Sequence, residues 1–300
     1  MSEAKYTPEE IISRLELKPV TQYQSEIISS PLEPSVVIAG AGSGKTETMS
    51  NRVLYLVANG FVTPDQILGL TFTRKAAGEL SVRIRKRLRQ LAAHKDFKHI
   101  VSTSTSVTTY HSYAGKLLSE HAIRYGIDAD AEPLGEAAIW QIASDVVRNW
   151  SDDSYRNQSA VSTVIKDLLG LSKLMLEHQV KAEDIERIGN EVLSALAPLQ
   201  GASNGEVRDV AKAMRQRNSL LPMVETFMQR RKAAGEFSFD DQMSLAADIA
   251  QNFEDVGVLE RGKYKVVLLD EYQDTSQSQV RMLSSLYGGG HPVMAVGDPS

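Results

Sequence analysis

Cysteine is absent from this chain of 300 residues. Its absence excludes disulfides, cysteine-ligated zinc and iron–sulfur clusters within the chain, and is compatible with a reducing compartment. The chain also lacks a run of about twenty apolar residues, which a membrane-spanning helix needs, and its first residues lack the pattern of a signal peptide. We therefore expect a soluble, cytoplasmic protein.

Excess positive charge is missing as well, because the net charge is −5. The total charge thus does not indicate a nucleic-acid-binding protein. The charge is unevenly spread, however, since residues 74–98 contain nine lysines and arginines against two acids. Such a segment is either a solvated basic helix or a surface that faces phosphates. In the second case we expect Arg83, Arg85 and Arg87 to contact them.

Glycines gather in one stretch that is typical of a phosphate-binding loop. The apolar run 36–38 gives way to glycines, closes on Lys45-Thr46 and continues into helical residues 47–58. Glycines let successive backbone N–H groups surround an anion, and the positive end of the following helix points at the same place. We expect Lys45 to reach the β- and γ-phosphates and the Thr46 hydroxyl to hold Mg²⁺. The predicted loop residues are Ala39, Gly40, Ala41, Gly42, Ser43, Gly44, Lys45 and Thr46.

Two helix starts precede this loop, one at Thr7-Pro8 and one at Thr21. Gln24 has two interpretations. As the third helical residue it completes a capping box with Thr21, but an amide upstream of a phosphate loop can also bind adenine. The spacing alone favours the cap by about two to one.

A continuous apolar run at 264–269 is typical of a buried parallel strand, and it ends in Asp270-Glu271. Adjacent carboxylates are costly unless a cation or a chemical task explains them. Asp270 is suited to share the Mg²⁺ ion with Thr46, and Glu271 is suited to act as a general base on water. The alternative is that both acids are turn or capping residues.

Two further strands are expected, at 67–72 and at 107–110. The first ends in Thr73, which caps a basic helix at 74–91, and the second follows a serine/threonine loop at 102–106 and precedes His111. Residues at the carboxyl ends of such strands lie on the ligand side of an open α/β sheet. Spacing alone assigns His111 no role.

From residue 114 the pattern becomes helical, with segments at 136–150, 160–177, 182–199 and 206–232. Polar stretches at 151–154 and 200–205 separate some of them, and we expect Trp140 and Met175 to pack in a core. The sequence thus predicts three parts: residues 1–113, a helical insertion at 114–236, and residues 237–300. A last strand at 292–296 ends in Gly297-Asp298, close to the final residue, which suggests the N-terminal part of a longer polypeptide.

Together these residues resemble the N-terminal motor half of the UvrD/Rep-like superfamily 1 DNA helicases. The resemblance favours adenine binding by Gln24. Arg74 stands where asparagine is more usual, and tyrosines 110 and 113 stand where phenylalanine is commoner. The matching segments are Thr21–Ile28 (Q motif), Ala39–Thr46 (motif I), Leu70–Ala77 (Ia), Thr109–Tyr113 (Ib), Phe239–Asp241, Asp270–Thr275 (II) and Gly297–Ser300 (the start of III).

The resemblance implies a RecA-like P-loop NTPase domain with a parallel sheet and a helical insertion subdomain. It implies ATP and Mg²⁺ as cofactors, with catalytic residues Lys45, Asp270 and Glu271 and metal ligands Thr46 and Asp270. Its partners would be single-stranded DNA, duplex junctions and a second RecA-like domain. The DNA-binding residues would be Thr71, Phe72, Thr73, Arg74, Thr109 and His111.

The implied function is 3′-to-5′ translocation on DNA, in double-strand-break repair or recombination. Within the family, residues 58–61, 73–80 and 266–275 look closest to the AdnB-type subunit of bacterial AdnAB helicase–nucleases, which implies a second helicase–nuclease subunit as partner. The alternative is an ATP-binding, non-translocating DNA-binding subunit of a repair complex. A GTPase or small-molecule kinase is disfavoured because the guanine-reading sequence Asn-Lys-x-Asp is missing.

Overall fold

The computed structural model describes residues 4–97, 104–128, 131–151, 160–199 and 205–298. The chain forms two compact units, one of residues 1–117 and 247–300 and the other of residues 118–246. The sequence predicted divisions at 113/114 and 236/237. Helices α5 (Tyr110–His121) and α10 (Phe239–Asn252) each run through a division, so no break in helical periodicity marks it.

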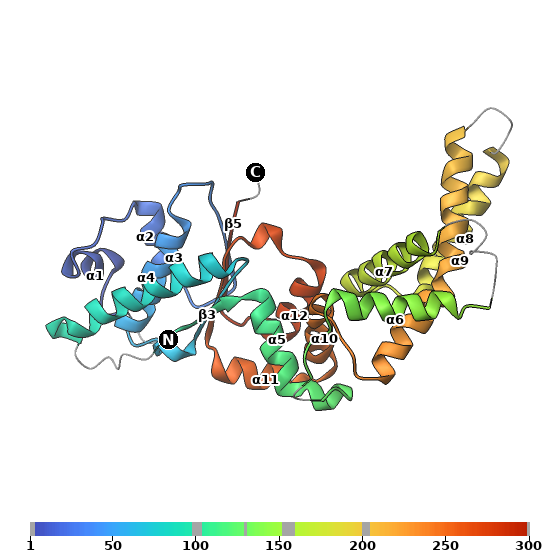
Figure 1. Ribbon diagram of the computed structural model, residues 1–300. Helices are drawn as coiled ribbons and strands as arrows, with labels where there is room; N and C mark the ends of the chain where they lie inside the picture. Colours follow the sequence, from blue (N-terminus) through green and yellow to red (C-terminus); the bar gives the residue numbers. More distant parts are fainter. Residues whose placement is uncertain (1–3, 98–103, 129–130, 152–159, 200–204, 299–300) are drawn as a thin grey trace. The chain divides into compact units, whose positions relative to one another are not determined.

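The first unit is built on a five-stranded sheet in the order β1-β5-β4-β2-β3, and every neighbouring pair is parallel (Figure 1). The predicted α/β class with a parallel sheet is confirmed. β2 and β4 are buried along their whole length, as expected for strands covered on both faces. The strands are β1 (Ser35–Ile38), β2 (Ile67–Thr71), β3 (Ser106–Thr109), β4 (Val266–Leu269) and β5 (Val293–Gly297).

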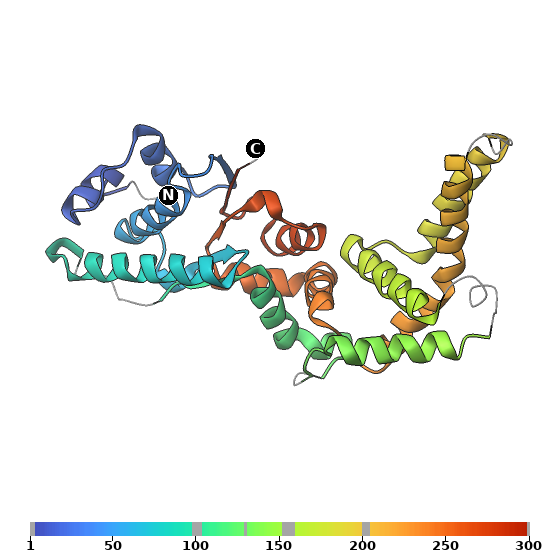
Figure 2. The ribbon, with the colours of Figure 1, turned by 45° about the horizontal axis from the view of Figure 1, so that its top comes forward.

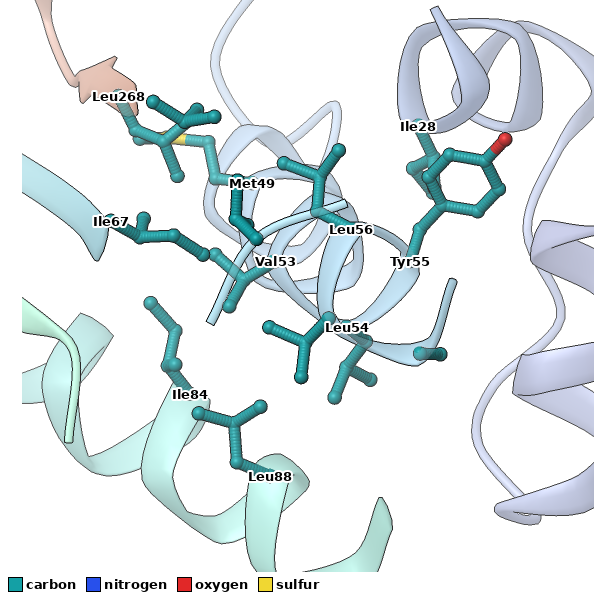
Figure 3. Close-up of a cluster of buried hydrophobic side chains, with 14 of the residues drawn as sticks. Ile28, Met49, Val53, Leu54, Tyr55, Leu56, Ile67, Ile84, Leu88 and Leu268 are labelled. Carbon is teal, nitrogen blue, oxygen red and sulfur yellow. The ribbon is translucent and has the colours of Figure 1, made fainter. Parts of the chain in front are cut away.

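The helices of this unit cover the sheet. α3 contacts α1, α2 and α4, and its side chains from Met49 to Ala58 are buried. Figure 3 shows Met49, Val53 and Leu56 of α3 facing Ile67 and Leu268 of the sheet. Burying a large aliphatic side chain contributes about 2 kcal/mol, so this apolar layer holds α3 firmly against the strands. The helices are α1 (Pro8–Arg14), α2 (Gln22–Ser29), α3 (Lys45–Ala58), α4 (Arg74–Ala93), α11 (Glu254–Lys263) and α12 (Gln277–Tyr287), with 3₁₀ turns η1 (Pro64–Gln66), η2 (Lys95–Phe97) and η5 (Tyr272–Asp274).

Both predicted helix starts near the N-terminus are confirmed. Thr7 and Thr21 are the N-caps of α1 and α2, and each forms a complete capping box. The strand expected at 107–110 ends one residue earlier. Tyr110 is instead the first residue of α5, and its side chain is fully buried.

The second unit is helical, with a core formed by α6, α7 and α9 (Figure 2). Met175 is buried, as predicted, but the prediction for Trp140 was wrong, because this side chain is 36% exposed. The buried face of α6 runs through Ala143, Val146 and Val147, and Trp140 lies beside that face. The elements are η3 (Ala122–Tyr125), α6 (Glu136–Arg148), α7 (Val161–His178), α8 (Ala182–Leu196), η4 (Ala197–Leu199) and α9 (Gly205–Ala233).

Some expectations fall outside the described residues. They are most of the predicted polar stretches 151–154 and 200–205, part of the serine/threonine loop, and Pro299-Ser300 of the expected last motif. Across the part of the chain that the structure describes, no helix is both long and apolar enough to cross a membrane.

Candidate active site

The predicted phosphate-binding loop joins the end of β1 to the start of α3. Gly42 and Gly44 have φ angles of 76° and 91°, a left-handed conformation that favours glycine. The Ser43 N–H donates to the Gly40 carbonyl at 3.3 Å, which closes the turn. Because α3 begins at Lys45, its N-terminus and partial positive charge lie at this loop. The loop thus has the local geometry of an anion-binding site.

The turn after β4 lies beside this loop. Lys45 Nζ is 3.5 Å from Glu271 Oε2, although the two residues are 226 positions apart. The Lys45 side chain is 11% exposed and that of Glu271 is 42% exposed. The sheet order explains the proximity, because only β5 separates β1 from β4 and all three strands point the same way. The structure therefore brings together the phosphate loop and the acidic strand end.

Asp270 is a buried carboxylate next to a second carboxylate. Burial raises the pKa of Asp270 above its ordinary value, and the charge of Glu271 raises it further. A hydrogen bond from the Glu271 N–H to Asp270 Oδ1, 3.2 Å long, and the charge of Lys45 act in the opposite direction. A buried acid with a raised pKa is poorly compensated by its protein surroundings.

This donor set fits a magnesium ion. Asp270 offers a hard anionic oxygen in need of a cation, and Thr46 follows Lys45 at the start of α3 with a hydroxyl. Within the described residues, no three histidine or carboxylate side chains gather into a metal cluster. Mg²⁺ commonly takes one or two protein ligands and completes its shell with phosphate oxygens and water. The paired donors therefore suit a nucleotide-bound ion.

Glu271 is held in a strained backbone conformation. Its φ of 50° and ψ of 45° place it in the left-handed region, which costs a non-glycine residue about 1 kcal/mol. The 3₁₀ turn η5 follows directly. Such strain persists where the surroundings fix it, and it is common at functional sites.

Gln273 is a part of the site that the sequence analysis did not assign. Its Nε2 donates to Glu271 Oε2 at 2.9 Å, while its Oε1 accepts from the Asp298 N–H at 2.9 Å. A Cβ atom on Gly297 would lie 2.7 Å from Gln273 Oε1, so glycine is needed there. Gln273 thus ties the position of Glu271 to the end of β5. The only signal in the sequence was its place within the acidic motif.

Both interpretations of Gln24 describe part of its geometry. Its Oε1 accepts from the Thr21 N–H at 3.1 Å, which is the cap contact. Its Nε2 donates to the Ser43 carbonyl of the phosphate loop at 3.2 Å. The two ends of one amide therefore serve the helix and the loop at once, and adenine contact is not excluded by the cap.

A cavity of about 270 Å³ adjoins the loop on the side of α2. Its lining combines apolar side chains with the Gln24 amide and Lys45. Tyr23, at its rim, is 79% exposed. A mostly apolar cavity with a few polar groups suits a flat heterocyclic base next to a phosphate site. Its lining includes Tyr23, Gln24, Ile27, Ile38, Lys45 and Met294.

The residues expected to bind DNA occupy the ends of β2 and β3, but they differ in exposure. Thr71 is fully buried, and its hydroxyl donates to the Thr73 carbonyl at 3.2 Å. Thr109 is also buried, with its hydroxyl bonded to Ser112. Phe72 is partly exposed. Thr73, Arg74 and His111 are exposed. The two buried threonines thus shape the loops, and the other four side chains reach the surface.

The basic helix α4 does not present all its arginines to solvent. Arg83 and Arg87 both pair with Glu47 of α3, and Arg87 also donates to Asn51 Oδ1 at 2.6 Å. Arg87 is buried. The expectation that Arg83 and Arg87 contact phosphates is therefore wrong, because both hold α4 to α3. Of the three arginines, Arg85 alone is exposed.

Comparison with known proteins gives a family match over most of the chain. Residues 20–300 match the UvrD/REP helicase N-terminal domain. The chain is 27% identical to ATP-dependent DNA helicase UvrD1 of Mycobacterium leprae, over 94% of this chain and 32% of that protein. It is 24% identical to ATP-dependent DNA helicase PcrA of Staphylococcus epidermidis, over 94% and 33%. It is 26% identical to DNA helicase II of Haemophilus influenzae, over 92% and 33%. The chain thus spans about a third of the length of these relatives.

Proposed function

This chain belongs to the UvrD/REP helicase family, and on that premise we propose that it is the ATP-binding part of an ATP-dependent DNA helicase. The observation that carries the proposal is the 3.5 Å contact between Lys45 and Glu271. It joins a loop suited to phosphates to an acidic strand end suited to a metal and a base. The names of the relatives, all DNA helicases, support DNA as the substrate.

Each residue of the proposed site has a separate task. The loop N–H groups and Lys45 bind the phosphates, and Thr46 with Asp270 holds Mg²⁺. Glu271 accepts a proton from the attacking water, and Gln273 keeps its carboxylate in place. The bound Mg²⁺ supplies positive charge that stabilises the transferring phosphoryl group. Gln24 and the neighbouring cavity bind the adenine base.

Single-stranded DNA would lie along the ends of β2 and β3. Phe72 offers a ring for base stacking, and Thr73, Arg74 and His111 are exposed beside it. Arg74 is also a cation in the first turn of α4, where a helix N-terminus already favours an anion. A phosphate group there would compensate both positive charges.

The finer assignments rest on the resemblance. We propose 3′-to-5′ translocation driven by ATP hydrolysis in the cytoplasm, with a second RecA-like domain of the same protein supplying the arginines that complete the site. Residues 114–236 would be a helical insertion in the first RecA-like domain. A role in double-strand-break repair, an AdnB-type subunit and a second helicase–nuclease subunit as partner are supported by the wording of residues 58–61, 73–80 and 266–275.

The test is ATP turnover by the full-length protein with and without single-stranded DNA. Lys45→Ala and Glu271→Ala should each abolish DNA-stimulated turnover. The controls Lys265→Ala and Glu33→Ala remove the same side-chain types at exposed positions and should leave it intact. Wild-type turnover that survives both site changes at the normal rate would overturn the proposal.

A non-translocating subunit is the second candidate, because such a protein can bind ATP merely to change its grip on DNA. The presence of Glu271 next to Lys45 favours hydrolysis instead. Stoichiometric ATP binding without turnover, in excess single-stranded DNA, would favour this second candidate.

A further inference from the structure

Tyr110 lies between the proposed DNA-facing surface and the proposed metal carboxylate. It is the first residue of α5 and is fully buried. Its hydroxyl donates to the main-chain oxygen of Asp270 at 3.3 Å. Burial raises the pKa of this hydroxyl, so it stays protonated and remains a donor.

The other side of the Tyr110 ring meets Phe72. The two ring centroids are 5.0 Å apart with an interplanar angle of 55°, a favourable tilted contact. Phe72 is partly exposed at the end of β2, and His111, the residue after Tyr110, is exposed. Tyr110 therefore touches the surface residue through its ring and Asp270 through its hydroxyl.

The strand order makes this contact possible. β2 lies between β3 and β4, so a residue directly after β3 must reach past the end of β2 to touch the end of β4. The Asp270 N–H is bonded to the Leu70 carbonyl of β2 at 2.9 Å, and the Tyr110 hydroxyl bonds the carbonyl of the same residue. The peptide groups on both sides of Asp270 are thereby tied to the strands that carry the proposed DNA contacts.

We propose that the Tyr110 hydroxyl is a positioning group that couples contact at Phe72 and His111 to the placement of Asp270 and Glu271. This inference rests on the proposed function. A base stacked on Phe72 would press on the Tyr110 ring, and the hydroxyl would carry the shift to the Asp270 carbonyl. Because Glu271 follows in a strained left-handed conformation, a small change at that carbonyl alters where its carboxylate points. Misplacing a catalytic group by about 1 Å can cost about a hundredfold in rate.

Tyr113 provides a matched control on the same helix. It is also buried, but its hydroxyl donates to Glu260 Oε2 at 2.6 Å and lies 2.7 Å from the Tyr287 hydroxyl. Glu260 and Tyr287 belong to α11 and α12 and to no part of the proposed site. Tyr113→Phe thus removes a buried hydroxyl bond of the same kind without touching Asp270.

The experiment compares Tyr110→Phe with Tyr113→Phe in the full-length protein. ATP turnover is measured without DNA and at saturating single-stranded oligonucleotide, together with oligonucleotide affinity and the melting temperature. Tyr110→Phe should lower the ratio of stimulated to basal turnover by about tenfold while oligonucleotide affinity stays near that of the wild type. Tyr113→Phe should lower the melting temperature and leave the ratio unchanged.

The outcomes separate this inference from the proposed function. A wild-type protein without DNA-stimulated turnover contradicts the proposed function itself. A stimulated wild type with an unchanged ratio in Tyr110→Phe overturns the inference alone, as does an equal fall in both variants. If Tyr110→Phe fails to fold, Phe72→Leu at saturating oligonucleotide decides: a lowered ratio supports the inference and an unchanged ratio overturns it.

Discussion

The Lys45 ammonium and the Glu271 carboxylate form an ion pair of 3.5 Å across the proposed site. Both groups are expected to engage other partners once ATP is bound, Lys45 with its phosphates and Glu271 with the attacking water. A nucleotide must therefore compete with Glu271 for the lysine. The pair would also keep the base away from water until a phosphate replaces it.

Glu271→Gln should separate binding from hydrolysis. The amide cannot accept the proton from water, so turnover should fall by about a hundredfold or more. Because Lys45 no longer pairs with a carboxylate, ATP affinity should stay equal or rise. Calorimetric ATP titration and steady-state turnover measure the two effects. The control Asp274→Asn, which changes an exposed neighbour that also accepts from Gln273, should alter neither by more than about twofold. A large loss of ATP affinity in Glu271→Gln would contradict the competition.

Asp270 should make the nucleotide-free protein less stable as the pH rises. Burial and Glu271 raise the pKa of Asp270 in the folded state, so the folded state holds its proton at pH values where the unfolded state has lost it. Stability therefore falls as the pH rises from the ordinary carboxyl pKa through the folded value, and the ionised acid is a cost at neutral pH.

Asp270→Asn removes that cost and keeps an oxygen that can accept from the Glu271 N–H. The variant should melt at a higher temperature than the wild type at pH 7 without nucleotide, and the difference should shrink as the pH is lowered toward 4. Excess Mg²⁺ and a non-hydrolysable ATP analogue should stabilise the wild type more than the variant. The exposed control Glu33→Gln should show neither effect. A lower melting temperature for Asp270→Asn at pH 7 would contradict this account.

The sequence was sufficient where a feature depends on neighbours along the chain. The phosphate loop follows from glycines between a strand and a helix, and its left-handed Gly42 and Gly44 are as expected. The meeting of Lys45 with Glu271 followed from parallel strands whose carboxyl ends share one edge. These predictions needed only strand direction and local chemistry.

Features that depend on a partner from a distant element could not be predicted. Arg83 and Arg87 look like a basic surface in the sequence, but Glu47 on α3 pairs with both. The hydroxyl of Tyr110 gains its meaning only from Asp270, 160 residues away. The helical period of α6 did not reveal which edge of the stripe Trp140 occupies. In each case the deciding contact is tertiary and leaves no local pattern.

Gln24 can be divided into its two tasks by a pair of substitutions. Gln24→Glu keeps an oxygen that accepts from the Thr21 N–H but loses the donor to the Ser43 carbonyl. It should retain the melting temperature of the wild type and bind ATP about tenfold more weakly, because a carboxylate near the loop repels phosphate. Gln24→Ala should lose both contacts and about 1 kcal/mol of stability.

The control for the cap is Gln279→Ala, which removes the same residue of the capping box on α12. It should cost similar stability and leave ATP affinity unchanged. Melting curves and ATP titrations on the three variants give the comparison. If Gln24→Glu binds ATP as tightly as the wild type, Gln24 is a cap and nothing more.

Glu47 should be the main electrostatic link between α3 and α4. It accepts from Arg83 at 3.1 Å and also from Arg87, whose side chain is 8% exposed. Removing one partner of a buried ion pair leaves an uncompensated charge, which typically costs about 3 kcal/mol. Glu47→Ala should lower the free energy of unfolding by about that amount, measured by urea denaturation. The control Glu79→Ala breaks an exposed pair with Lys75 and should cost less than about 1 kcal/mol. Equal effects of the two changes would show that the apolar packing of Ile84 and Leu88 holds the helices together without the ion pairs.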